Sequence, residues 1–358
     1  MSARLRELVT DRRILVCCGS GGVGKTTTAA VLALEAARAG RRAVVVTIDP
    51  AKRLADALGL EGLTGAPARI DGDWSGELWA LMLDTKSTFD DLVLANAATP
   101  EQGTRILENR FYRNISSALS GTQEYMAMEK LYELHQRTDF DLVVVDTPPT
   151  RNALDFIDAP RRLSRFLDHR LFRMVTTPGR GVMKAVNVAT QTFLRTVAKV
   201  VGGEVIDDAV AFFRAFEGME EGFRQRADAV LHLLSADETA FVLVASPRRD
   251  TIEEAQFFAA RLAEADIAVR ALIVNRMHPT FGKGLAEAAG ERAATLAGTE
   301  LGGLYRNLAD FRLVAAREER HVAGLASAVA PAPVVRVPFL PIDVHDIDGL
   351  TALAAWMV

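Results

Sequence analysis

Four residues near the start of the chain have the identities and the spacing needed to bind phosphate groups. In the stretch "CCGSGGVGKTTTAA", Gly19, Gly24, Lys25 and Thr26 satisfy the pattern GxxxxGK followed by Ser or Thr. Glycines let backbone N–H groups converge on an anion at a helix N-terminus, where the helix dipole favours negative charge. Lys25 would hold the β- and γ-phosphates of a nucleotide, and the Thr26 hydroxyl would bind Mg²⁺. The other predicted nucleotide-binding residues of this loop are Gly21, Gly22, Val23 and Thr27.

Two aspartates that close apolar runs are the predicted partners of this loop. Asp49 lies in "VTIDPAKRLADALG" and Asp146 in "FDLVVVDTPPT", so both should reach the carboxyl edge of a parallel sheet, where such sheets bind ligands. One carboxylate can orient an attacking water and the other the Mg²⁺ shell, each reaching the metal through water. A strand-end aspartate alone is more often a helix N-cap, but the phosphate loop favours function here. With Lys25 they form the predicted catalytic set, and residues 48–56 and 146–155 are predicted switches.

The elements that must position these residues alternate along the chain. Short Val-, Ile- and Leu-rich runs such as "RILVCC", "RAVVVTIDP", "FDLVVVDTPP", "AFVLVASP" and "RALIVNRMHP" are typical of strands buried on both faces of a parallel sheet. Helical patterns separate them. The sequence therefore predicts an α/β fold, a doubly wound, mostly parallel sheet of the P-loop NTPase type. We expect an ATPase core from residues 1–150 and 236–358, with residues 151–235 inserted as a helical subdomain.

Composition excludes several classes of partner. The 358 residues carry a formal net charge of -4, so the chain has no excess of positive charge that would predict binding to nucleic acid or to an anionic membrane. No stretch approaches the roughly 20 apolar residues that span a bilayer, and the first residues lack the apolar core of a signal peptide. These features predict a cytoplasmic protein without stable membrane insertion. The adjacent cysteines, Cys17 and Cys18, should point to opposite faces of a strand, so they cannot readily hold one ion together.

Four segments, "GSGGVGKTTTA", "TIDPAKRLADALG", "VVVDTPPTRNALDF" and "LIVNRMHP", together resemble a known family. In order and spacing they are similar to the ArsA-like ATPases of the deviant Walker A class, which include anion pumps and the guided-entry ATPases that target tail-anchored proteins. The resemblance implies a dimeric ATP hydrolase with ATP and Mg²⁺ as cofactors. It also implies that Asp49 polarises the attacking water and that Asp146 and Thr147 belong to the second switch. Asn275 would read adenine, and the base pocket would be lined by Pro338, Phe339 and Leu340.

One position departs from the family pattern. Members of this class usually carry a lysine directly before the paired glycines, and that lysine crosses a dimer interface to the partner's nucleotide, whereas this chain has Ser20. A hydroxyl supplies no positive charge, and losing such a cation can cost on the order of 10³-fold in rate. The sequence thus favours a heterodimer with a lysine-bearing paralogue over a homodimer, with weak hydrolysis by the isolated chain. Arg151 is an alternative source of the charge.

What the nucleotide cycle drives is open to three interpretations. The first is a targeting ATPase or chaperone that binds hydrophobic client helices and reaches the membrane surface during delivery. Apolar residues of the insert could line its groove, or they could be ordinary core. They are Phe166, Leu167, Phe172, Met174, Val175, Met183, Phe193, Phe212, Phe213, Phe216, Met219 and Phe223. The second is an arsenite-pump subunit, disfavoured because neither cysteine lies in the insert. The third is a non-catalytic, nucleotide-responsive scaffold.

Overall fold

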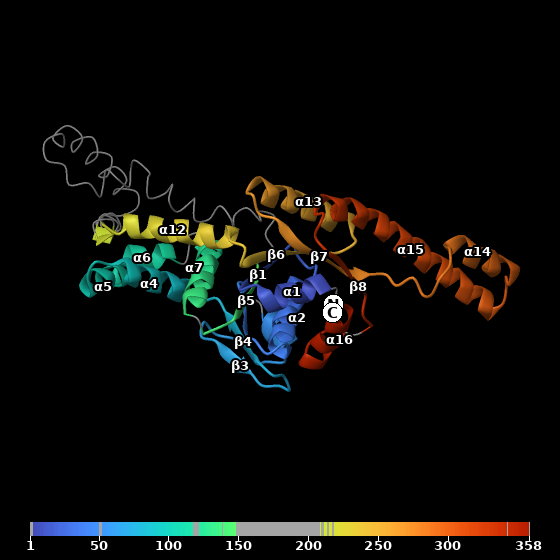
Figure 1. Cartoon of the computed structure of the whole chain (residues 1–358), viewed down its shortest axis with the longest axis horizontal. Helices are drawn as coiled ribbons and strands as arrows, with labels where there is room; N and C mark the ends of the chain where they lie inside the picture. The colour runs from blue at the N-terminus through green and yellow to red at the C-terminus, as the bar shows by residue number, and fades with distance from the viewer. Residues whose placement is uncertain are drawn as a thin grey trace. The chain divides into compact units, whose positions relative to one another are not determined.

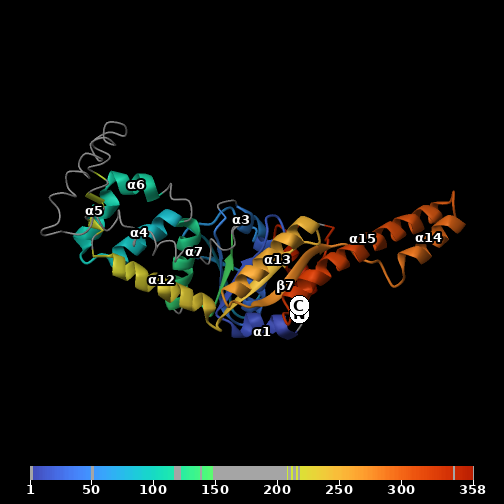
Figure 2. The ribbon, with the colours of Figure 1, turned by 90° about the horizontal axis from the view of Figure 1, so that it is seen from above.

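The computed structural model describes residues 3–49, 52–116, 122–137, 139–147, 208, 211, 212, 215, 216, 218–341 and 343–357. The chain divides into two compact units. The sheet unit comprises Met1–Leu83, Glu133–Leu154 and Ser235–Val358, and the helical unit comprises Asp84–Tyr132 and Asp155–Leu234. Figures 1 and 2 draw both units, and each is considered by itself below.

An eight-stranded sheet forms the centre of the sheet unit, in the order β3-β4-β2-β5-β1-β6-β7-β8. Its strands are β1 Ile14–Cys18, β2 Arg42–Thr47, β3 Ala68–Ile70, β4 Glu77–Met82, β5 Leu142–Asp146, β6 Thr239–Ala245, β7 Val269–Met277 and β8 Val334–Pro338. Only the pairing of β3 with β4 is antiparallel, and all other neighbouring pairs are parallel. Every residue of β1, β5 and β6 is buried, as expected for strands covered on both faces. The predicted fold class is confirmed.

Helices cover both faces of this sheet. The helices of the unit are α1 Ala3–Asp11, α2 Lys25–Arg38, α3 Arg53–Ala57, α13 Arg249–Glu264, α14 Ala286–Thr295, α15 Glu300–Ala328 and α16 Ile347–Met357, of which α14 packs on α15. Apolar residues of α1, α2 and α16 share one core cluster with alternate residues of the central strands. Figure 1 shows α13 and α15 on the opposite side of β6 and β7 from α1 and α2, with α14 lying along the far end of α15.

Parallel pairing brings chemistry to the carboxyl edge of the sheet. Asp146, the last residue of β5, pairs in register with Cys17 of β1 on one side and with Thr47 of β2 on the other. The loop after β1 turns directly above this point and needs glycine at Gly19 and Gly24, where φ is 143° and 98°. A Cβ at Gly19 would collide with the Val244 carbonyl oxygen, and one at Gly24 with the Asn275 amide. Sequence and topology therefore fix the loop next to Asp146.

The helical unit is held together by aromatic side chains. Its helices are α4 Thr85–Asn96, α5 Pro100–Glu108, α6 Arg110–Ser116, α12 Glu220–Ser235 and most of α7 Thr122–Gln136. Phe212 packs between Tyr112 and Phe216, and Phe216 packs against Phe223, with ring centroids 5.0–6.0 Å apart. All four rings are buried, so this aromatic cluster forms a core in the described part of the unit.

Two predictions from the sequence concern this unit. Residues 84–132 were predicted to belong to the ATPase core but group here with residues 155–234, because their helices pack on the aromatic cluster. Of the twelve apolar residues predicted to form a client groove or a core, Phe212, Phe216, Met219 and Phe223 are buried. The other eight lie outside the described residues. Within the described part of the chain, no helix is both long enough and apolar enough to cross a membrane.

Candidate functional site

The phosphate loop presents its lysine from the first position of α2. Lys25 is only 6% exposed, and its Nζ donates a hydrogen bond to the Ser20 carbonyl oxygen at 2.9 Å. Burial lowers the pKa of Lys25, and the nearby Asp146 carboxylate opposes that shift. A buried ammonium bonded to a neutral carbonyl is poorly compensated. A phosphate group would therefore be a better partner for Lys25 than the carbonyl that it now contacts.

Asp146 is the centre of a hydrogen-bond network that joins three strands and the loop. Its Oδ2 accepts from the Thr26 hydroxyl at 2.8 Å and from the Thr47 hydroxyl at 2.9 Å. Thr47 in turn accepts from the Asp49 backbone N–H at 3.2 Å. On the other side of β5, the Thr147 hydroxyl donates to the Cys17 carbonyl at 2.8 Å. The network thus couples the loop to the starts of both predicted switches.

The second oxygen of Asp146 makes this carboxylate fit a divalent cation. Asp146 is 1% exposed, and its Oδ1 has no hydrogen-bond partner among the described residues. Burial raises the pKa of Asp146 to about 6, with Thr26 and Thr47 opposing the shift. A buried carboxylate with an unsatisfied oxygen beside a hydroxyl is the oxygen-rich environment that Mg²⁺ prefers when phosphates and waters complete its shell. Thr26 and Asp146 therefore fit the predicted metal role.

Asp49 lies at the wall of a cavity above the loop. The cavity has a volume of about 420 Å³ and is lined by Gly22, Gly24, Lys25, Thr26, Thr27, Asp49, Arg53, Asp56, Ala57, Thr147, Arg276 and Val344. The Asp49 side chain is 16% exposed, and its Oδ2 lies 3.5 Å from the Arg53 guanidinium. An acidic oxygen that faces a cavity shared with Lys25 and Thr26 is placed to orient a water near bound phosphates.

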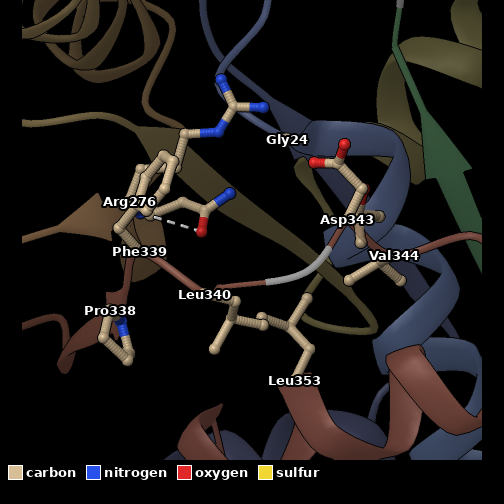
Figure 3. A pocket seen from close by; sticks show the side chains of 10 residues that line it. Gly24, Arg276, Pro338, Phe339, Leu340, Asp343, Val344 and Leu353 are labelled. Carbon is tan, nitrogen blue, oxygen red and sulfur yellow. Dashed lines mark hydrogen bonds between the residues drawn. The ribbon is translucent and has the colours of Figure 1, made fainter.

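A second cavity of about 480 Å³ adjoins the first, because Gly24, Thr27, Arg276 and Val344 line both. Its remaining lining residues are Asn275, Pro338, Phe339, Leu340, Asp343 and Leu353. Figure 3 shows Pro338, Phe339 and Leu340 on the strand and loop that enclose this cavity, with Leu353 of α16 below them. The apolar side chains in its mixed lining suit a flat base, and Asn275 comes together here with the three predicted base-pocket residues.

The amide of Asn275 is engaged on both sides. Its Nδ2 donates to the Val23 carbonyl at 3.0 Å, and its Oδ1 accepts from the Arg276 backbone N–H at 2.9 Å. Each bond uses one of the two N–H donors on Nδ2 or one of the two lone pairs on Oδ1, so the amide keeps one donor and one acceptor for a base. The arrangement ties the end of β7 to the phosphate loop, so that a base and its phosphates would be held at a fixed spacing.

Two of the predicted loop residues line neither cavity. Gly21 is exposed and Val23 is buried beneath the loop. Arg151, the alternative source of positive charge, lies outside the described residues, as does most of the second predicted switch. Three residues that the sequence analysis did not select take part: Thr47, Arg53 and Arg276. The only sequence signal for Thr47 is its place two positions before Asp49, because its bond to Asp146 depends on the register of β2 with β5.

The cysteines and acidic residues offer no rival metal site. Cys17 and Cys18 are both buried, and burial raises the pKa of each thiol, which disfavours the thiolate that soft metals and metalloids require. In the part of the chain that the structure describes, no group of three or more His, Cys, Asp or Glu side chains could hold an ion.

Known proteins are similar in sequence to most of the chain. The model of the family described as Anion-transporting ATPase matches residues 12–284, ending just before α14. ATPase get3 of Aspergillus terreus is 24% identical over 282 residues, which make up 77% of this chain and 77% of that protein. The ATPase ASNA1 homolog of Dictyostelium discoideum is 25% identical over 260 residues, 72% of this chain and 70% of that protein.

A third relative, ATPase GET3 of Phaeosphaeria nodorum, is 25% identical over 262 residues, 72% of this chain and 74% of that protein. These matches confirm the predicted ArsA-like resemblance and the predicted enzyme class, an ATP hydrolase. The chain belongs to the anion-transporting ATPase family.

Proposed function

We propose that this chain binds Mg-ATP in the two adjoining cavities and hydrolyses it there. The observation that carries the proposal is the buried Asp146 carboxylate, with one oxygen held by Thr26 and Thr47 and the other without a partner among the described residues. A water on a cation bound at Thr26 would satisfy that oxygen, and Lys25 would contact the same phosphate chain. The base would occupy the cavity lined by Asn275, Pro338, Phe339 and Leu340.

In this mechanism each side chain has a separate task. Lys25 exchanges the Ser20 carbonyl for the terminal phosphates. Its positive charge then offsets the negative charge that develops on them during hydrolysis. Thr26 and, through water, Asp146 and Asp49 would hold Mg²⁺, which when bound supplies further neutralisation of the phosphates. Asp49 orients the attacking water. Because Thr47 bonds both Asp146 and the Asp49 backbone, a change at the metal shell is transmitted to the first switch.

The cycle needs a cation that position 20 does not supply. Ser20 is 6% exposed, and its hydroxyl has no partner among the described residues. We propose that this chain works as a dimer with a lysine-bearing homologous subunit, whose lysine completes the site described here. A homodimer is the alternative, and it would hydrolyse ATP slowly.

We further propose that hydrolysis controls the binding of hydrophobic, membrane-protein client helices in the cytoplasm, with delivery at the membrane surface. Similarity to proteins named ATPase GET3 and ASNA1 homolog supports this proposal. The buried aromatic cluster does not, so any client surface lies elsewhere than at Phe212, Phe216 and Phe223. An arsenite-pump role gains no support from two buried cysteines. A nucleotide-responsive scaffold would bind ATP without turnover.

Calorimetric titration of Lys25→Ala with Mg-ATP tests the site. Removing the ammonium should lower affinity by on the order of 100-fold, because charge-assisted contacts to phosphate are lost. Lys86→Ala is the matched control, since Lys86 is exposed on α4 and paired with Asp90. Equal affinities for the Lys25 variant and the wild type would refute the site.

A mixed complex with a lysine-bearing homologue tests the dimer. Asp49→Asn in this chain should abolish most of the ATPase activity of the complex, whereas the equivalent change in the partner should remove little. The asymmetry follows because only this chain's site would receive a lysine from across the interface. Fast hydrolysis by the isolated chain would contradict the need for a partner.

A further inference from the structure

Arg276 lies at the junction of the base cavity and the phosphate cavity and has no task in the mechanism of Lys25, Thr26 and the two aspartates. It is the second-last residue of β7, is exposed, and lines both cavities. Figure 3 shows its side chain pointing from β7 toward the loop that carries Gly24. Its Nη1 donates a hydrogen bond to the Gly22 carbonyl at 3.1 Å. A permanent positive charge thus lies against the phosphate loop.

The backbone is distorted in a way that places this side chain there. In a regular strand, neighbouring side chains point to opposite faces. Here Asn275 and Arg276 both reach the loop and donate to the consecutive carbonyls of Val23 and Gly22. This is possible because Arg276 has a φ of 63° and the pairing of β7 with β8 changes register between Val274 and Met277.

That conformation is unfavourable for an arginine. A left-handed backbone at a residue with a side chain costs on the order of 1 kcal/mol, and such residues cluster at functional sites. One hydrogen bond from an exposed guanidinium to a neutral carbonyl offsets little of this backbone cost, because solvent weakens the bond. The geometry therefore indicates a stronger partner for Arg276 than Gly22.

We propose that Arg276 binds the phosphate chain of the nucleotide at the point where it passes from the base cavity to the phosphate cavity. The inference rests on the proposed ATP site. A guanidinium has five N–H donors in a planar fork, and its bonds to phosphate are about twice as strong as bonds between neutral groups. Arg276 exchanges or shares its loop carbonyl when the nucleotide enters.

The positive charge of Arg276 lies on the same chain as the nucleotide site that it would contact. It holds the nucleotide in the ground state and in the transition state alike, so it increases affinity without increasing the rate at saturation. Arg276 therefore lets this chain bind ATP before any homologous subunit docks, although Ser20 leaves the rate dependent on that subunit. It is a nucleotide-binding residue and not a substitute for the missing catalytic cation.

The competing explanation is that Arg276 only braces the loop through Gly22. Two substitutions separate the explanations, because glutamine keeps an N–H donor for the carbonyl and methionine keeps neither donor nor charge. If the charge binds phosphate, Arg276→Gln and Arg276→Met should both weaken Mg-ATP binding, by on the order of 10-fold for an exposed, charge-assisted contact. If the residue is only a brace, Arg276→Gln should bind like the wild type.

Salt dependence gives the second measurement. Titrations of the full chain with Mg-ATP at low and high ionic strength should show a shallower loss of affinity with salt in both variants than in the wild type, because one charge contact has been removed. In the hydrolysing assembly, KM should rise while kcat is unchanged. Arg306→Gln, on α15 and lining neither cavity, is the control and should match the wild type.

Four outcomes decide the matter. Equal weakening in both variants with a shallower salt dependence supports the proposal. Wild-type affinity in Arg276→Gln, wild-type affinity in both variants, or weakening with unchanged salt dependence overturns it. Failure of the ATP site itself is distinguishable, because Lys25→Ala would then also bind Mg-ATP like the wild type.

Discussion

Asp146 in the sheet unit and Glu129 in the helical unit are both buried carboxylates, but they are held differently. In both, burial is the largest cause of a raised pKa. Glu129 has a donor on each oxygen: the Tyr125 hydroxyl at 2.6 Å and the Arg226 guanidinium at 2.7 Å. Asp146 has two donors on one oxygen and, among the described residues, none on the other.

The difference separates a structural network from a ligand site. Glu129 links α7 to α12 through Arg226, whose guanidinium also lies 4.1 Å from the centroid of the Tyr132 ring. That network is complete without any further molecule. The Asp146 network leaves one carboxylate oxygen for a bound ion or its water, and Lys25, the other buried charge of the site, is hydrogen-bonded to a neutral carbonyl that a phosphate could replace. Substitution of Asp146 should therefore lower ATPase activity, and substitution of Glu129 should lower the free energy of unfolding.

The largest effect should come from Asp146→Asn. An amide keeps an oxygen for Thr26 and Thr47 but loses the charge that faces Mg²⁺. Hydrolysis in the active assembly should fall by about 1000-fold, equivalent to about 4 kcal/mol. The free energy of unfolding without nucleotide should not fall, since a buried charge has been removed. Steady-state kinetics and urea denaturation measure the two effects. A variant that is unstable but active would contradict the contrast between the two carboxylates.

The next effect concerns the aromatic cluster of the helical unit. Phe223 is 0% exposed, and truncating it to alanine should lower the free energy of unfolding by about 3 kcal/mol, because a cavity replaces a packed ring. Phe257, 55% exposed on α13, is the matched control and should change stability by less than about 0.5 kcal/mol. If both variants denature at the same urea concentration, Phe223 is not core, and a client groove at this position becomes tenable again.

Glu129→Ala should produce the opposite result to Asp146→Asn. Without the carboxylate, the buried Tyr125 hydroxyl and the Arg226 guanidinium lose their partner. We expect the free energy of unfolding to fall by about 2 kcal/mol, below the range for fully buried pairs because Arg226 is partly exposed. ATP affinity should be unchanged. Glu253→Ala, which breaks the exposed pair with Arg249 on α13, should cost less than about 0.5 kcal/mol.

Sequence alone indicated which residues the fold brings together at the candidate site where local chemistry or strand direction decides it. The phosphate loop is contiguous, and parallel strands carry Asp49 and Asp146 to one edge whatever their separation along the chain. Thr47 was missed because its role depends on the register of β2 with β5. Arg276 was missed because a local irregularity in β7, which alternation does not predict, turns it toward the loop.

The division into units was harder to predict for a related reason. Helices α4 to α7 have no local feature that says which core they join. Their assignment is decided by contacts with residues about 100 positions later, such as the bond from the Gln102 amide to the Ala215 carbonyl. Tertiary packing of this kind leaves little trace in a single sequence, whereas the alternating strands of the sheet unit leave a clear one.

The smallest expected effect is the pH dependence of the stability that Glu129 contributes. Because its pKa is raised in the folded chain, the native state binds a proton more tightly than the unfolded state above the usual glutamate value of 4.5. Its contribution to stability is therefore greatest at low pH and declines as pH rises through that range. The groups facing it are the Tyr125 hydroxyl and the Arg226 guanidinium, which both oppose the larger effect of burial on the Glu129 pKa. The stability difference between wild type and Glu129→Ala should thus narrow as pH rises from 4.5 toward neutrality, in urea titrations without nucleotide. A difference that widens with pH would mean that Arg226 outweighs burial, and Glu129 would then be a net stabilising ion.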